Sequence, residues 1–402
     1  MPDRQDPEAN LAGRRVLPGE VARFNAPLIL LYTLTHFVGD VYASYISPLL
    51  PLFQQRFGLS KTMCGALYGA QTSMISFCQP PLGFLADRLQ TRSLLILGPV
   101  VSGVFFSLMG LAPSFWWLMA LLMMGGLGVA AFHPSATALT ARAAGPKRHL
   151  AVSILISGGI LGAAVGYPLV VFLTQRFGLH RLGFSMIPAL LLAPVLYFVV
   201  PRFRRSGMIP APIPLRLSEI PKPVRVLFGI AFFRGFVGTA IPAFTPLLLA
   251  DRGYPLSAGG TALSAYMVAG IIGNFLGGWM AEKVGTRAVI FWFLSLSFPC
   301  LVGFTLAKGP AYFPFLLASG LLLSASPPAE IVLAQRSMPE HTAAVSGVFT
   351  GLIWGAGGLS MIGAGAVADR LGTAQAMLML WPLALIAALI ALALPKPAHK
   401  SA

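Results

Sequence analysis

The sequence predicts an all-α membrane protein with twelve transmembrane helices arranged as two six-helix halves. Of its 402 residues, 56% are hydrophobic and only 10% are charged, whereas soluble proteins carry ~25% charged residues. The apolar stretches are long and continuous, which excludes the short alternating segments of a transmembrane β-barrel. Each stretch can cross a hydrocarbon core of ~30 Å as a helix.

The expected helices follow one another with short polar connections, and one long connection interrupts them. The helices are expected at residues 26–52, 61–85, 93–112, 115–141, 149–173, 182–200, 224–249, 259–281, 288–307, 312–335, 342–366 and 374–394. The long connection is rich in proline and arginine. The expected parts are therefore an N-terminal tail at 1–24, a six-helix bundle at 25–200, a linker at 201–223, a second bundle at 224–395 and a tail at 396–402.

The net charge of +16 orients the chain in the membrane. With both termini inside, most lysines and arginines fall in cytoplasmic segments, as the positive-inside rule requires. We expect a multi-pass protein of the bacterial inner membrane with both termini in the cytoplasm. The basic segments would contact anionic lipid, and we expect no nucleic-acid partner. Cys64, Cys78 and Cys300 lack the spacing of a metal site or disulfide, so we expect no metal and no cofactor.

Sequence repeats indicate how the helices are related. Residues 83–92 (GFLADRLQTR) match residues 278–287 (GWMAEKVGTR) at the equivalent point of the second half. Weaker copies end the fifth expected helix (FLTQRFGLHR from Phe172) and the eleventh (GAVADRLGT from Gly365). Because the second and fifth helices would end on opposite sides of the membrane, each half is expected to contain two inverted three-helix repeats.

The segment at 83–92 resembles the signature of major facilitator transporters, and the inverted repeats are the architecture of that superfamily. Its acid and arginines would make charge-assisted contacts that clamp one conformation. The expected clamp residues of the two halves are Gly83, Asp87, Arg88 and Arg92, with Glu282, Lys283 and Arg287. A closer resemblance, carried by residues 35–40 (THFVGD) and 131–134 (AFHP), is to the fosmidomycin-resistance family. It implies a proton-driven exporter of small molecules.

Five ionisable residues lie within the apolar stretches, where a charge costs ~2.5–3.5 kcal/mol. Asp40 is the expected proton-coupling group, because a poorly hydrated carboxylate tends to take up a proton. His36 lies one helical turn earlier on the same face and can share that proton. His133, before Pro134, is expected to bind substrate or relay protons. Pinning of helices by these groups is the structural alternative.

Arg234 is the repeat counterpart of His36. A guanidinium keeps its charge, so it is expected either to neutralise Asp40 or to bind an anionic substrate. Glu330 is expected to act as a gate by pairing with Arg336 or Arg142, or to transfer protons. Further substrate-binding candidates are Gln71, Asn274 and Tyr266. Glycines 158, 162 and 166 form a small-residue face typical of close helix packing.

These features predict a secondary active transporter that exports a small anionic or amphiphilic molecule, such as a drug or metabolite, by proton antiport and alternating access. The alternatives are a proton-linked importer of an organic anion and, more remotely, a sensor on a transporter scaffold. The sequence has no H-E-x-x-H motif, nucleophile elbow or P-loop, so we do not expect an enzyme. The expected partners are the small-molecule substrate, protons and lipid, and we expect a monomer.

Overall fold

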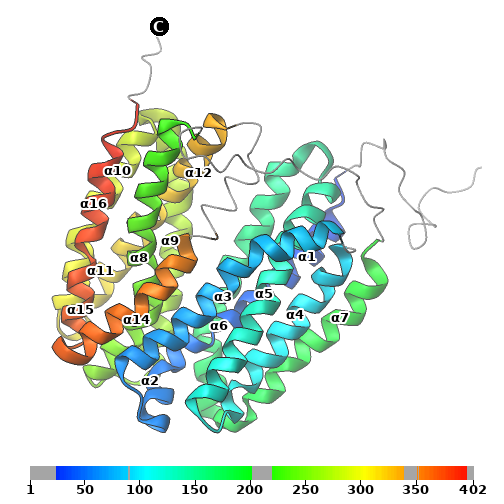
Figure 1. The fold of residues 1–402 in the computed structure, drawn as a ribbon, viewed down its shortest axis with the longest axis horizontal. Coiled ribbons are helices and arrows are strands. Elements are labelled where there is room, and N and C mark those ends of the chain that lie inside the picture. Colours follow the sequence, from blue (N-terminus) through cyan, green and yellow to red (C-terminus); the bar gives the residue numbers. More distant parts are fainter. Residues whose placement is uncertain (1–23, 89–90, 202–219, 339–350, 352, 396–402) are drawn as a thin grey trace, which may run out of the picture.

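The computed structural model describes residues 24–88, 91–201, 220–338, 351 and 353–395, and the regular elements in these ranges are all helices (Figure 1). The tails expected at 1–24 and 396–402, most of the expected linker and the first part of the helix expected at 342–366 lie outside these ranges. The side chains of residues 86–88, 91 and 149 are likewise outside the description.

The described residues of the first half form seven α-helices and three short 3₁₀ helices. They are α1 (Ala26–Ala43), α2 (Ile46–Phe57), α3 (Lys61–Arg88), α4 (Thr91–Ser107), η1 (Leu108–Leu111), α5 (Phe115–Ala143), η2 (Gly145–Lys147), α6 (Arg148–Phe177), η3 (Leu179–Met186) and α7 (Ile187–Val199). The helix expected at 26–52 is thus interrupted between α1 and α2. At this interruption the Gln71 side-chain amide donates a hydrogen bond of 2.7 Å to the Ala43 carbonyl. By contrast, α5 continues through Pro134 without a break.

The described part of the second half repeats this plan. It contains α8 (Lys222–Asp251), α9 (Leu256–Val284), α10 (Thr286–Leu306), η4 (Gly309–Ala311), α11 (Tyr312–Ser324), α12 (Ser326–Ser337), α14 (Ile353–Leu371), α15 (Thr373–Leu380) and α16 (Pro382–Ala391). Two expected helices are interrupted next to prolines. The first break, at Ala325, precedes Pro327 and Pro328, and the second, at Trp381, precedes Pro382. Proline has no backbone N–H with which to bond the preceding turn, so the helix is interrupted there.

Ten segments of the described chain are long and apolar enough to cross a membrane. Neither α3 nor α14 is among them, although both lie where the second and eleventh helices are expected. The all-helical membrane fold is confirmed, whereas the number twelve is not exactly reproduced by this criterion.

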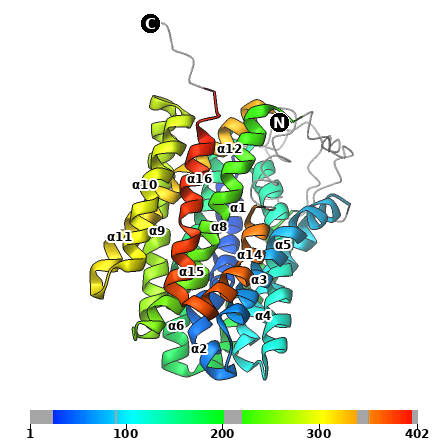
Figure 2. The ribbon, with the colours of Figure 1, turned by 60° about the vertical axis from the view of Figure 1, so that its left-hand side comes forward.

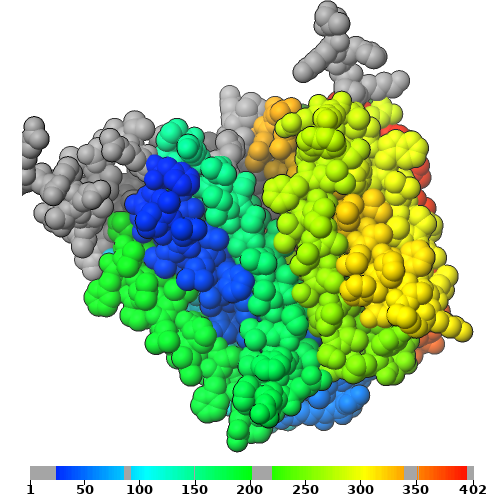
Figure 3. All heavy atoms as spheres, turned by 180° about the vertical axis from the view of Figure 1, so that it is seen from behind, coloured from blue at the N-terminus to red at the C-terminus, as the bar shows by residue number. Residues whose placement is uncertain are grey.

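The two halves meet mainly where α3 packs on α14, α6 on α9 and α2 on α8, with smaller contacts of α2 with α9 and of α3 with α8 (Figures 1 and 2). From behind, α1, α6 and α9 lie side by side (Figure 3). Glycines let α3 and α14 approach closely, since an added Cβ at Gly365 would lie only 2.5 Å from the Lys61 carbonyl oxygen. This close approach brings the two halves together at the end of the bundle where α3 begins.

The predicted glycine face of α6 packs against α1. An added Cβ at Gly158 would lie 2.5 Å from the Thr33 side chain, and one at Gly166 would lie 2.5 Å from the Val41 carbonyl oxygen. Gly162 faces the Phe37 backbone in the same way. The close-packing interpretation is confirmed, and its consequence is that α6 lies against the ionisable residues of α1.

Candidate functional site

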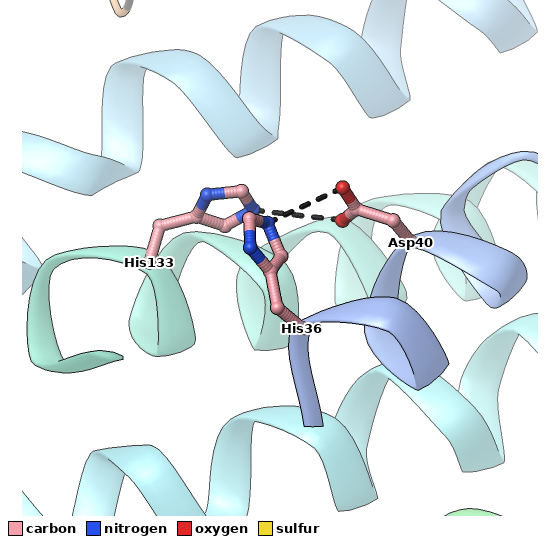
Figure 4. A group of neighbouring side chains, drawn as sticks. All are labelled: His36, Asp40 and His133. Atoms are coloured by element: carbon pink, nitrogen blue, oxygen red, sulfur yellow. Dashed lines mark ion pairs between the residues drawn. The ribbon is translucent and has the colours of Figure 1, made fainter. Parts of the chain in front are cut away.

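His36, Asp40 and His133 form one cluster, with two residues on α1 and one on α5 (Figure 4). His36 Nε2 lies 3.3 Å from Asp40 Oδ2, and His133 Nε2 lies 3.7 Å from Asp40 Oδ1. The two imidazole rings meet edge to face with centroids 4.9 Å apart. The side chains of Asp40 and His133 are 21% and 28% exposed, so water can reach the cluster.

The hydrogen bond of His36 determines which of its two ring nitrogens carries the hydrogen in the neutral ring. Its Nδ1 lies 2.8 Å from the Leu155 carbonyl oxygen of α6, and a carbonyl only accepts, so Nδ1 carries the hydrogen. In the neutral ring, Nε2 is then an acceptor that faces a second acceptor, the Asp40 carboxylate. This contact is favourable only when a proton or another cation lies between the two atoms. The cluster is therefore built to hold a positive charge.

The other two intramembrane charges pair with each other. Arg234 on α8 donates from Nε to Glu330 Oε1 at 3.1 Å and from Nη2 to Glu330 Oε2 at 3.3 Å. Glu330, at the start of α12, is only 1% exposed in its side chain, and Arg234 is 12% exposed. Such a two-point contact is the strongest form of arginine–carboxylate pair. It also keeps a buried carboxylate from being left without a partner.

This pairing changes two expectations. Arg234 has Glu330 as its carboxylate partner, not Asp40, and Glu330 binds Arg234 rather than the expected Arg336 or Arg142. The reason is topological: the break at Ala325 starts α12 beside α8, which brings Glu330 to Arg234. The five charges thus form a histidine–aspartate cluster in one half and an ion pair in the other.

Two tyrosines interact electrostatically with these two groups. Tyr167 of α6 lies within electrostatic range of Asp40 and of Tyr266, and Tyr266 of α9 lies within range of Arg234. Tyr266 is 9% exposed. Of the other polar candidates, Asn274 is half-buried on α9. Gln71 donates from its amide nitrogen to the Ala43 carbonyl, and its Oε1 is buried without a hydrogen-bond partner. Tyr266 is the supporting candidate that interacts electrostatically with Arg234.

The predicted clamp residues are only partly described. Gly83 lies opposite Pro134, with 3.5 Å from an added Cβ to the proline ring, and the Arg92 guanidinium lies 4.8 Å from the Tyr197 ring centroid. The side chains of Asp87 and Arg88 are outside the description.

In the second half, the ammonium group of Lys283 lies 3.9 Å from the Trp279 ring centroid. Arg287 donates a hydrogen bond of 3.2 Å to the Leu394 carbonyl. Glu282 is exposed. Each described contact lies within one half, so none of them joins the halves.

Another group of residues does join the two halves, and the sequence did not identify them as site residues. Asp369 of α14 accepts hydrogen bonds from the backbone N–H groups of Lys61 and Thr62, at 2.6 and 2.9 Å, and from the Thr62 hydroxyl. The Lys61 ammonium group lies 2.6 Å from Asp251 of α8, which also accepts from the Thr373 hydroxyl. We call Lys61, Thr62, Asp251, Asp369 and Thr373 the end latch. The copied motif GAVADRLGT, which contains Asp369, was the signal that pointed to it.

Comparisons with known proteins agree with this architecture. The model of the Major Facilitator Superfamily matches residues 32–360. The fosmidomycin resistance protein of Escherichia coli is 25% identical over 357 residues, covering 87% of this chain and 88% of the relative. The 4-hydroxybenzoate transporter PcaK of Pseudomonas aeruginosa is 24% identical and covers 81% of each chain. The crystal structure of a bacterial homologue of the human lysosomal transporter Spinster aligns with a TM-score of 0.78 at 18% identity, over 93% of this chain and 99% of that chain.

Proposed function

Because the chain belongs to the major facilitator superfamily and is therefore a membrane transporter, we propose that it is a proton-coupled exporter of a small anionic or amphiphilic molecule. The His36–Asp40–His133 cluster holds the coupling proton, and Arg234 provides the fixed cation for the substrate. Export proceeds by proton antiport across the bacterial inner membrane.

The observation that carries this proposal is the contact of His36 Nε2 with Asp40 at 3.3 Å. Because Nδ1 is committed to the Leu155 carbonyl, a proton must occupy the contact for it to be attractive. Loss of that proton leaves two acceptors of α1 facing each other, and any shift of the His36 ring that relieves this repulsion disturbs its hydrogen bond to Leu155 of α6. Proton binding thus has a mechanical consequence at the packed face between α1 and α6.

The substrate is assigned to Arg234 for reasons of charge. A guanidinium has five N–H donors, and the pair with Glu330 uses two of them. Further N–H donors can bind a carboxylate, phosphate or phosphonate while Glu330 keeps the arginine oriented. Tyr266 interacts electrostatically with Arg234, and Tyr167 with both Tyr266 and Asp40, so a substrate bound beside these tyrosines would interact with both halves.

Antiport requires that the proton and the substrate are carried in turn and not together, and each acts only through its different affinity for the two states. The end latch holds the two halves together at the end where α3 begins, which the expected topology places at the periplasm. We therefore assign the described conformation to a state closed toward the periplasm. The substrate would bind from the cytoplasm in this state and the coupling proton from the periplasm in the opposite state, so that each ligand is carried in one direction of the cycle.

The test is the direction in which protons cross the membrane when the probe is transported. Protein would be reconstituted into liposomes loaded with a fluorescent pH indicator, with the membrane potential clamped, and fosmidomycin added outside. Antiport moves protons out as the probe enters and makes the lumen more alkaline, whichever way the protein is inserted. Proton symport makes the lumen more acidic. The proposal predicts an alkaline change, and acidification would overturn it.

The second candidate, proton-linked import of an organic anion, is favoured by the similarity to a 4-hydroxybenzoate transporter. The same assay with 4-hydroxybenzoate as the probe tests it. Acidification with this probe and no response to fosmidomycin is the result expected of an importer. The Arg234 and Asp40 sites would serve both functions, so only the direction of proton movement separates them.

A further inference from the structure

The histidine–aspartate cluster has the composition and spacing of a metal site. His36 Nε2, His133 Nε2 and an Asp40 oxygen all lie within 4.8 Å of one another. His36 Nε2 lies 3.3 Å from Asp40 Oδ2, and His133 Nε2 lies 3.7 Å from the other carboxylate oxygen, Oδ1. Neighbouring ligands around a tetrahedral ion with bonds of about 2.0–2.1 Å are separated by roughly 3.3 Å. Small rotations of the side chains would therefore suffice to coordinate one ion.

The surroundings of the cluster also fit metal binding. A histidine that ligates a metal usually donates its other ring N–H to a carbonyl or carboxylate, which fixes the ring and directs the free nitrogen to the ion. The bond of 2.8 Å from His36 Nδ1 to the Leu155 carbonyl has this arrangement. His36 Nε2 and His133 Nε2 are both buried without a hydrogen-bond partner. Both nitrogens thus lie beside the Asp40 carboxylate, where either a proton or a metal ion can lie between nitrogen and oxygen.

The α6 backbone passes directly beside the donor atoms, and residue 159 there is glycine. An added Cβ at Gly159 of α6 would lie 2.5 Å from both Asp40 Oδ2 and His36 Nε2. A side chain at this position would therefore crowd the two donor atoms. The partial exposure of Asp40 and His133 leaves further coordination positions open to water or to a chelating molecule.

We propose that His36, Asp40 and His133 bind one divalent first-row transition-metal ion, such as Co²⁺, Ni²⁺ or Zn²⁺, that arrives free or held by a small chelating anion. Two imidazoles and a carboxylate suit these ions, whereas Mg²⁺ and Ca²⁺ prefer oxygen ligands. We further propose that the metal ion or its chelate is the transported substrate, and this part of the inference rests on the proposed transport function. In that case the metal replaces the proton between His36 and Asp40.

The test is a spectroscopic titration that requires no transport. Tag-free protein, freed of metal and purified in detergent, would be titrated with Co²⁺, whose visible absorption reports nitrogen and oxygen ligation. We expect one ion per chain in the unaltered protein. The variants His133→Gln and Asp40→Asn each remove a ligand and should weaken binding at least tenfold. Gly159→Ala keeps all three ligands and should weaken binding by crowding the ion.

Matched controls separate ligation from folding. His180→Gln changes an exposed histidine of η3, and Gly39→Ala changes a glycine whose added Cβ would meet nothing within 4 Å; both should bind Co²⁺ like the unaltered protein. A parallel titration with cobalt–nitrilotriacetate tests the chelated source. Binding of either form that is lost in His133→Gln supports the proposal, whereas no binding, or equal binding by His133→Gln and the unaltered protein, overturns it. Proton coupling is measured separately in metal-free buffer, so either proposal can fail alone.

Discussion

The Asp369 carboxylate of α14 accepts a hydrogen bond of 2.6 Å from the backbone N–H of Lys61, so the last turn of a helix in one half caps the first turn of α3 in the other. The first N–H groups of a helix have no partner within the helix, and a carboxylate there also interacts favourably with the helix dipole. A cap of this kind that crosses between two halves stabilises α3 only while that end is closed. Its strength therefore contributes to the conformational equilibrium.

Asp369→Ala is expected to open this end more often. Loss of a capping side chain costs about 1 kcal/mol, which corresponds to roughly a fivefold shift in population. Cys64, a buried thiol on the first turn of α3 that lies within electrostatic range of Lys61 and Asp369, is a built-in reporter. In a Cys78→Ser, Cys300→Ser background, maleimide should label Cys64 about fivefold faster after the substitution. An unchanged labelling rate would show that Asp369 does not hold this end closed.

The Lys61–Asp251 ion pair should make a smaller contribution that depends on salt. Asp251 is 41% exposed in its side chain, and exposed pairs contribute ~0.2–1 kcal/mol. Lys61→Asp should therefore speed Cys64 labelling, and adding Asp251→Lys should restore part of the slow rate at low salt. If the double substitution labels as fast as Lys61→Asp alone, the two charges do not interact across the halves.

Breaking the buried Arg234–Glu330 pair is expected to destabilise the protein more than removing it. Glu330→Ala leaves a buried guanidinium without its carboxylate, at a cost of roughly 3–5 kcal/mol, whereas apolar replacement of both partners is often tolerated. Thermal unfolding of the detergent-solubilised protein should show a lower midpoint for Glu330→Ala than for the double variant Arg234→Met, Glu330→Leu. The double variant should still fail to transport the probe, because the fixed cation is gone.

Two substitutions, Gly162→Ala and Gly39→Ala, form a matched pair that tests the packing between α1 and α6. A Cβ at Gly162 would overlap the Phe37 backbone, while one at Gly39 would meet nothing within 4 Å. Overpacking costs typically 1–3 kcal/mol, and alanine favours a helix over glycine by about 1 kcal/mol. Gly162→Ala should therefore lower the unfolding midpoint and Gly39→Ala should not. Equal effects of the two would contradict the close approach of the helices.

The fold could be predicted from the sequence because bilayer thickness, charge bias and internal repeats constrain long apolar helices strongly. The glycine face of α6 was predictable for the same reason, since residues four apart share one side of a helix. The partner of His36 within its own helix, Asp40, also followed from spacing. The contribution of Leu155 did not, because a backbone carbonyl on another helix leaves no mark in the sequence.

The pairing of Arg234 with Glu330 could not be predicted, because it depends on how α12 starts after the break at Ala325. The repeat identified Arg234 as the counterpart of His36 in the second half but said nothing of its closest partner. Asp369 illustrates the converse case. Its motif was recognised as a repeat, yet its contact with α3 depends on packing between segments separated by more than 300 residues.

The most direct test of proton coupling compares two kinds of transport by Asp40→Asn in proteoliposomes with fosmidomycin as the probe. Asparagine keeps the shape of aspartate but cannot take up the coupling proton. Exchange of labelled for unlabelled probe across the membrane, which needs no net proton movement, should continue at a measurable rate. Accumulation driven by an imposed pH gradient should be lost, while His180→Gln should behave like the unaltered protein. Full gradient-driven accumulation by Asp40→Asn would contradict the assignment of Asp40 as the proton-coupling group.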